Sequence, residues 1–166
     1  MIRMNDSLGA PLQILVPMKP LSHGKTRLSD EMSDLDRKSV VMLMLHRVMT
    51  AASDAFGTGA CNVIGGDDLV KHVVDEIGAN WNPDSLGDLN RILDCYASRS
   101  FELGSRAVMY LPADIPAITG EDLRAIETAS RDYSRAVGVR AASDGGTNAL
   151  LHPKALAVKF QLGPNS

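Results

Sequence analysis

Short apolar runs alternate along the chain with longer stretches whose apolar positions recur at helical spacing. Leu12–Met18 is a nearly continuous apolar run closed by prolines, which is typical of a buried strand. Asp34 or Asp36 is the predicted cap of a helix that runs to about Phe56, whose apolar residues fall on one face, and Gly57 follows as a stop signal. Strands that alternate with helices in this way predict a three-layer α/β/α fold with a mostly parallel sheet.

The same pattern continues toward the C-terminus. It predicts strands at Asn62–Ile64, Ala107–Leu111 and Ala136–Val139, and helices at Leu69–Ile77, from Asp84 or Ser85 to Leu103, and at Gly120–Ser130. The segment around Trp81 fits neither pattern, and no helix is predicted after Ala141. Ligands of parallel α/β sheets bind beyond the carboxyl ends of the strands. The loops of interest are therefore Lys19–Ser29, Gly65–Asp68, Pro112–Thr119 and Ala141–Asn148.

Composition narrows the class of protein. The 166 residues are 45% apolar and 22% charged, as expected of one globular domain. A net charge of −3 argues against a nucleic-acid-binding face, and no apolar run reaches the ~20 residues that a membrane helix needs. We expect a loose tail at residues 1–11, a single domain at residues 12–166, and a cytoplasmic protein whose Cys61 and Cys95 are reduced core thiols.

The loop after the first predicted strand concentrates positive charge. Residues 7–29 contain no Asp or Glu, whereas Lys19, Lys25 and Arg27 all lie within them. Lysine and arginine can neutralise the charge that develops on a transferring phosphoryl group. The pattern therefore predicts a polyphosphate site, with a solvated basic loop as the alternative.

A carboxylate follows the predicted strand Ala107–Leu111. Asp114 lies between two prolines there, and the hard cation Mg²⁺ prefers oxygen ligands of this kind while it bridges to phosphates. The alternative is that Asp114 caps the next helix, but Thr119 is itself a good N-cap. We therefore predict that Asp114 is a metal ligand.

Other candidate residues carry weaker signals. Residues 143–148 and 163–166 are glycine-rich turns, whose backbone N–H groups can bind anions but often serve only to reverse the chain. Asn90 lies in a predicted helix, where it either hydrogen-bonds a nucleotide or is a surface residue. The four histidines show no ligand spacing, so no catalytic histidine is expected.

Five segments in this order resemble the 2-phospho-L-lactate/phosphoenolpyruvate guanylyltransferase family (CofC/FbiD), within the MobA-like nucleotidyltransferase superfamily. They are VPMKPLSHGKTRLS at Val16–Ser29, LN at Leu89–Asn90, LPADIP at Leu111–Pro116, GGTNALL at Gly145–Leu151 and FQLGPNS at Phe160–Ser166. The resemblance implies a Rossmann-like sheet of the nucleotide-diphospho-sugar transferase type. It also implies transfer of GMP from GTP to a small phosphorylated carboxylic acid, with release of pyrophosphate, in biosynthesis of the deazaflavin coenzyme F(420).

The resemblance assigns the nucleotide side of the site to the first half of the chain. By motif, Lys19, Lys25 and Arg27 would hold the triphosphate as catalytic cations, and Asn90 would contact the nucleoside side. A phosphate monoester acceptor is already anionic, so this chemistry needs alignment and charge neutralisation more than a strong base. That requirement agrees with the absence of a catalytic histidine from the prediction.

The metal and the acceptor are assigned in the same way. Asp114 would bind Mg²⁺ or Mn²⁺ and bridge to the α-phosphate, while Thr147, Gly163 and Ser166 would grip the acceptor's phosphate and carboxylate. Family members continue for several tens of residues beyond the position of Ser166. We therefore expect the domain to lack the family's C-terminal segment.

Several alternatives stay open at this point. The sequence does not distinguish 2-phospholactate, phosphoenolpyruvate and 3-phosphoglycerate as acceptors, nor does it define base specificity or whether the chain forms a homodimer. A related nucleotidyltransferase that uses a molybdopterin or a sugar phosphate is the first alternative function. A nucleotide-binding module without turnover is the second. The expected partners are small molecules, with neither nucleic acid nor membrane among them.

Overall fold

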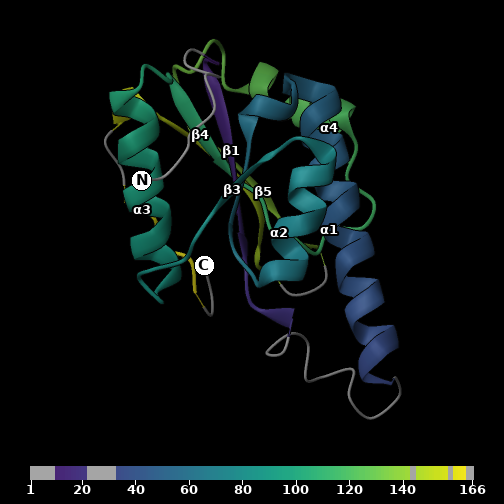
Figure 1. Ribbon diagram of the computed structural model, residues 1–166. Coiled ribbons are helices and arrows are strands. Elements are labelled where there is room, and N and C mark those ends of the chain that lie inside the picture. The colour runs from purple at the N-terminus through teal and green to yellow at the C-terminus, as the bar shows by residue number, and fades with distance from the viewer. Residues whose placement is uncertain (1–9, 22–32, 143–144, 157–158, 164–166) are drawn as a thin grey trace.

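The computed structural model describes residues 10–21, 33–142, 145–156 and 159–163. Its strands and helices in chain order are β1 (Leu12–Met18), α1 (Asp34–Phe56), β2 (Cys61–Gly65), α2 (Asp68–Ile77), β3 (Asn80–Asn82), α3 (Leu89–Glu102), β4 (Ala107–Tyr110), α4 (Gly120–Ala129), β5 (Val137–Arg140) and β6 (Thr147–Pro153). Single 3-10 turns lie at Thr58–Ala60 and Lys154–Leu156. Together they form a sheet between two layers of helices (Figure 1), which confirms the predicted three-layer α/β class.

The sheet has six strands in the order β3-β2-β1-β4-β6-β5. Strands β1 to β4 run parallel to one another, whereas β6 runs antiparallel to both β4 and β5. The parallel part contains the centre of the sheet, where β1 lies between β2 and β4. The antiparallel pair extends the sheet on the β4 side, so the sheet is mixed and mostly parallel.

Helices cover both faces of the sheet, and the direction in which the chain travels accounts for the separate face of α3. From β1 to β3 the chain moves one way across the sheet, and α1 and α2 lie on one face together with α4 (Figure 1). From β3 the chain returns past β1 to β4, and the connecting helix α3 covers the opposite face. Right-handed crossovers require this change of face when the direction reverses.

Two apolar clusters fill the space between the layers. Alternate residues of a strand point to opposite faces of the sheet, so Ile14 and Val16 pack beneath α1 and α2 while Leu15 packs beneath α3. Val63 and the adjacent Ile64 divide between the clusters in the same way. These strands are buried on both faces, which explains why their sequences are nearly continuous apolar runs.

A short polar side chain begins each of these helices. Ser33, Asp67, Asp88 and Thr119 each accept a hydrogen bond from the backbone N–H three residues further on. The sequence placed the start of α3 at Asp84 or Ser85, and this prediction was wrong. Asp84 instead accepts bonds from the N–H groups of Leu86 and Gly87, and this turn delays the helix to Leu89.

Two strands have no counterpart in the predictions. Asn80–Asn82 is a three-residue edge strand around Trp81, too short to show a period. Thr147–Pro153 forms β6, whose burial does not alternate because it lies between β4 and β5 and packs on both faces. Both strands were missed because their pairing with neighbours, rather than a local pattern, defines them.

The expected N-terminal tail is described only from residue 10 onward. Residues 1–9 of the expected tail lie outside the described residues, and the Pro11 carbonyl accepts hydrogen bonds from the N–H groups of Arg106 and Ala107.

The two cysteines differ in burial. Cys61 is buried, and burial raises its pKa to about 12. Cys95 is exposed, so it is not the core thiol that was predicted. None of the described helices combines the length and the apolar character needed to cross a membrane.

Candidate functional site

The site lies where the order of the strands reverses. Because β4 follows β3 in the chain but lies beside β1 on its other side, the connection after β1 runs across the sheet toward β2, whereas the connection after β4 runs the other way toward β5. In open α/β sheets the crevice between two such connections, at the carboxyl ends of the strands, is where ligands bind. The carboxyl end of β1 points to the bottom of Figure 1.

The described part of the cationic loop begins at this reversal. Lys19 directly follows β1 and is exposed, so its ammonium group can reach a ligand beyond the strand end. Lys25 and Arg27 lie outside the described residues, and their assignment to the triphosphate stays a prediction. The structure therefore places one of the three predicted cations at the switch point.

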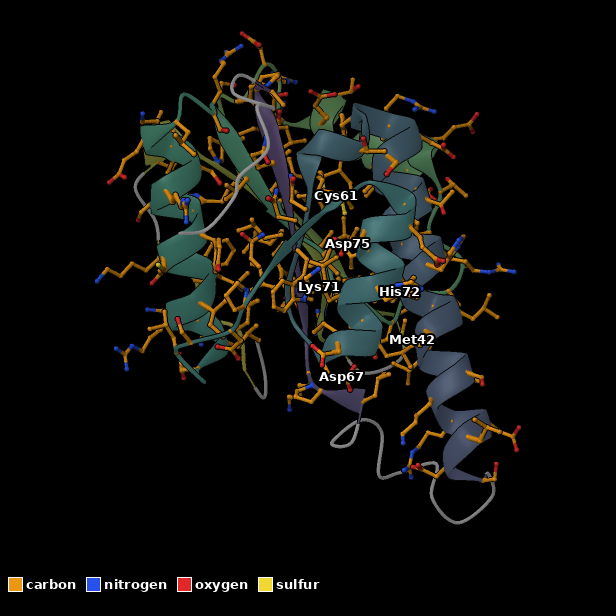
Figure 2. The ribbon with its side chains drawn as sticks, in the orientation of Figure 1. Met42, Cys61, Asp67, Lys71, His72 and Asp75 are labelled. Carbon is orange, nitrogen blue, oxygen red and sulfur yellow. The ribbon has the colours of Figure 1, made fainter. Side chains whose placement is uncertain are left out.

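Asp67 fixes the start of the loop, a role that no local sequence pattern indicates. One of its carboxylate oxygens accepts a hydrogen bond from the Leu21 N–H at 3.1 Å, and the other accepts one from Val70 at 3.3 Å in the first turn of α2. Figure 2 shows Asp67 at the start of α2, beside the carboxyl end of β1. Local sequence can indicate Asp67 only as a helix cap, because its bond to Leu21 joins residues 46 positions apart.

The loops that follow the first three strands approach one another closely at this edge. Gly65 ends β2 with a positive φ of 91°, and a Cβ at this position would lie 2.4 Å from the carbonyl oxygen of Met18. The Gly65 carbonyl in turn accepts a hydrogen bond from the Trp81 indole N–H at 2.9 Å. A residue without a side chain is required here because two backbones meet at the rim of the site.

We expect Gly65→Ala to lower the free energy of unfolding by about 2–4 kcal/mol, since strained backbone conformations cost ~1–3 kcal/mol and the clash with Met18 adds to that. Urea denaturation measures the loss. Gly57→Ala is the matched control, because Gly57 has a φ of 84° but no atom within 4 Å of the added Cβ. Equal losses in the two variants would contradict the close approach.

Asp114 lies in the loop after β4. The loop first continues the sheet, since the Leu111 N–H donates to the Leu15 carbonyl at 3.0 Å. Ala113 and Ile115 both pack against the core, while Asp114 between them is exposed at the carboxyl end of the sheet. The Asp114 carboxylate is close enough to Tyr110 to add to burial, the larger cause, in raising the pKa of that tyrosine.

The alternative role for Asp114 is excluded by the cap of α4. Thr119 and Asp122 form a reciprocal capping box at the start of that helix, so Asp114 is not its cap. Within the described ranges no group of three or more potential metal-ligating side chains occurs. A single carboxylate nevertheless suits Mg²⁺, which usually takes one or two protein carboxylates and completes its coordination with water and substrate phosphates.

The glycine-rich turn before β6 brings Thr147 to the same end of the sheet. Strand β6 runs antiparallel to β4, with Leu150 opposite Tyr110, so its first residue Thr147 lies beyond the carboxyl end of β4. The turn is closed by a 2.7 Å hydrogen bond from the Ala141 N–H to the Gly146 carbonyl. Residues 143 and 144 of this turn lie outside the described residues.

Gly163 lies near this edge because the preceding residue, Leu162, is hydrogen-bonded to the first turn of α3. Helix α3 begins at the carboxyl end of the sheet, and Asn90 in its first turn donates to the Leu162 carbonyl at 2.9 Å and accepts from the Leu162 N–H at 2.7 Å. Gly163 follows directly and is exposed, with nothing within 4 Å of where a Cβ would lie. Ser166 lies outside the described residues. The nucleoside contact predicted for Asn90 stays a prediction, and the observed partner of its side chain is the backbone of Leu162.

The fold and this site define a class of protein. The structure is similar to that of a protein from Desulfovibrio desulfuricans G20 assigned as a nucleotide-diphospho-sugar transferase, with a TM-score of 0.73 and 16% identity over 89% of this chain and 65% of that one. A cytidylyltransferase from Leptospira borgpetersenii has a TM-score of 0.59 and 14% identity over 89% of this chain and 62% of its own. The chain thus spans somewhat less than two thirds of these solved chains. Its fold is that of the nucleotide-diphospho-sugar transferases.

Within this class the chain belongs to the guanylyl transferase CofC-like family, whose profile matches residues 12–164. The phosphoenolpyruvate guanylyltransferase of Rubrobacter xylanophilus is 32% identical over 92% of this chain and 74% of its own length. The enzyme of the same name from Roseiflexus castenholzii is 29% identical over 93% and 70%. The 2-phospho-L-lactate guanylyltransferase of Methanocaldococcus fervens is 28% identical over 84% and 60%.

Proposed function

We propose that this protein transfers GMP from GTP to a small phosphorylated carboxylic acid and releases pyrophosphate, as a cytoplasmic step in biosynthesis of coenzyme F(420). One observation carries the proposal: a chain of the guanylyl transferase family has Lys19 and Asp114 at the carboxyl ends of adjacent strands, on either side of the topological switch point. The candidate acceptors are phosphoenolpyruvate, 2-phospholactate and 3-phosphoglycerate. Residues 12–166 form the nucleotidyltransferase domain in this proposal.

The reaction is an in-line displacement at phosphorus. An oxygen of the acceptor's phosphate forms a bond to the α-phosphorus of GTP, and the bond from that phosphorus to the β-bridging oxygen breaks, so that pyrophosphate leaves with the electron pair. The attacking phosphate is already an anion and needs no general base. Holding the two substrates in line, and neutralising their charges, therefore accounts for most of the catalysis.

The residues at the switch point suit a reaction that depends on alignment and charge neutralisation. Lys19 lies at the start of the cationic loop, and with Lys25 and Arg27 it would attract the triphosphate and stabilise the departing pyrophosphate. Asp67, through its bond to the Leu21 N–H, holds the start of that loop at the beginning of α2. This arrangement supports a nucleotide-binding role for the loop.

Asp114 would hold the divalent cation, which when bound supplies charge neutralisation at the phosphate oxygens of GTP. The exposed carboxylate and the open end of the sheet fit a cation that takes its remaining ligands from substrate and water. Thr147 and Gly163 would bind the acceptor, since a hydroxyl and backbone N–H groups suit an anionic ligand. The two subsites then lie on opposite sides of the β4 end.

A pyrophosphate-release assay tests the proposal. Purified protein with GTP and Mg²⁺ is given each of the three phospho-acids in turn, and CTP and ATP serve as nucleotide controls. Pyrophosphate release that requires both GTP and one of the acids supports the proposal. Release only with a sugar phosphate or a molybdopterin would identify a related nucleotidyltransferase. Nucleotide binding in calorimetry without any release would identify a binding module.

We expect Thr147→Val to raise the KM for the phospho-acid about 10–150-fold, because one hydrogen bond to a charged group contributes ~1.5–3 kcal/mol. The KM for GTP should change little. Steady-state kinetics with each substrate varied in turn measures both constants. Thr147→Ser keeps the hydroxyl and is the control. A rise confined to the KM for GTP would place Thr147 on the nucleotide side.

A further inference from the structure

A short C-terminal segment is held against helix α3 by two side chains rather than by a neighbouring strand. One carboxylate oxygen of Asp94 accepts a hydrogen bond from the Phe160 N–H at 2.9 Å. The amide of Asn90 forms a reciprocal pair with the backbone of Leu162, at 2.7 and 2.9 Å. The segment is thus bound through its backbone, as it would be in a sheet.

The spacing of these contacts matches the geometry of the two elements. Asn90 and Asp94 are four positions apart, on one face of α3, and four helical residues rise about 6 Å. Phe160 and Leu162 are two positions apart, and two residues of extended chain rise about 6.6 Å. Two successive side chains of a helix can therefore bind two alternate residues of an extended segment without distortion.

The burial pattern fixes the register of the segment. Phe160 is buried in the apolar cluster under α3, Gln161 is exposed, and Leu162 packs partly against the same cluster. A slip by one residue would turn Phe160 into solvent and would break all three hydrogen bonds. The side-chain contacts and the apolar packing therefore specify the same alignment, and Gly163 follows Leu162 directly.

We propose that Asn90 and Asp94 are positioning residues that set the place of Gly163 in the acceptor subsite. The inference rests on the proposed function, because it is the phospho-acid that Gly163 would bind. Both amide atoms of Asn90 are directed at Leu162, so this residue acts through the segment rather than on the nucleotide. Asp94 acts in the same way one helical turn further on.

Kinetics of the full chain with GTP and phosphoenolpyruvate test the inference. Asp94→Ala should raise the KM for the phospho-acid about tenfold and leave the KM for GTP within twofold. Asp94→Asn keeps an oxygen acceptor for the Phe160 N–H and should restore the wild-type value. Asn90→Ala removes two bonds and should raise the same constant further. Ser98→Ala, an exposed position on α3, is the matched control and should change neither constant.

Amide hydrogen exchange supplies a second readout that does not depend on turnover. The Phe160 amide should exchange at least tenfold faster in Asp94→Ala than in the wild type, and the Leu162 amide should do so in Asn90→Ala. Faster exchange with an unchanged KM for the phospho-acid would overturn the positioning role. A rise confined to the KM for GTP would also overturn it.

The failure of the proposed function is recognisable separately. If the wild-type chain releases no pyrophosphate with any of the three acids, the proposed reaction is wrong, and the inference that rests on it is wrong as well. If the wild type turns over and Asp94→Ala matches it in both constants, only the inference fails. Melting temperatures of all variants, measured alongside, distinguish a lost contact from a lost fold.

Discussion

Replacing Asp114 by Asn should lower GTP-dependent pyrophosphate release at least ~10²-fold while the protein stays folded. Asn keeps the size of the side chain and removes its charge, and deleting one group that stabilises charge in a transition state typically costs ~10²–10³ in rate. The position is exposed, and Thr119 rather than Asp114 caps α4, so the effect on stability should be small. The rate should fall without a change in melting temperature.

Titration with Mg²⁺ and Mn²⁺ is the measurement that separates a metal ligand from any other role. The variant should need at least tenfold more metal for half-maximal rate, because its remaining oxygen ligand is neutral. Glu102→Gln is the control, since it removes a negative charge at the far end of α3 and should leave the titration unchanged. An Asp114→Asn protein with the wild-type rate and metal requirement would reduce Asp114 to a local structural residue.

The second large effect is expected in the cationic loop. Lys25→Ala and Arg27→Ala should each lower turnover at least ~10²-fold, because losing one fixed positive charge beside a developing phosphoryl charge costs ~3–4 kcal/mol. Both residues lie outside the described residues, and the prediction rests on the acid-free stretch of sequence that begins before Lys19. Single-turnover rates with saturating phospho-acid measure the effect on the chemical step.

A cation elsewhere serves as the control for the loop variants. Arg99→Ala removes a positive charge in the last turn of α3, at the opposite end of the sheet, and should keep wild-type turnover. Lowered rates in all three variants would indicate a general effect of net charge. Near wild-type pyrophosphate release by both loop variants would remove the triphosphate from this loop.

The fold was predictable where local pattern and tertiary environment agree. Helix α1 ends at Phe56, directly before its predicted stop signal, but it begins at Asp34 because Ser33, rather than Asp34 or Asp36, caps it. The central strands were recognisable because burial on both faces leaves them with continuous apolar runs. Prediction failed at β3 and β6, which are defined by their partners. It also failed at the start of α3, where Asp84 accepts from two N–H groups as a cap would, but Gly87 has a positive φ of 68° and Asp88 caps the helix instead.

The candidate site was predictable as a set of loops but not as a set of contacts. The rule that ligands bind beyond the carboxyl ends of parallel strands selected the loops that hold Lys19, Asp114 and Thr147. Asp67 and Asp94 could not be found in this way, because each acts through a backbone N–H far away in the sequence. A carboxylate that accepts from a distant backbone group leaves no periodic or spaced signal in the chain.

The burial of Phe160 has a consequence for any deletion study of this protein. Its ring closes the apolar cluster under α3, and its exposed fraction is only 4%. A chain cut short before this residue would lose part of its hydrophobic interior together with Gly163, and proteases would attack α3 more readily. Shortened forms therefore cannot separate acceptor recognition from stability, whereas proteins with single substitutions at Asp94 or Gly163 still contain the Phe160 ring.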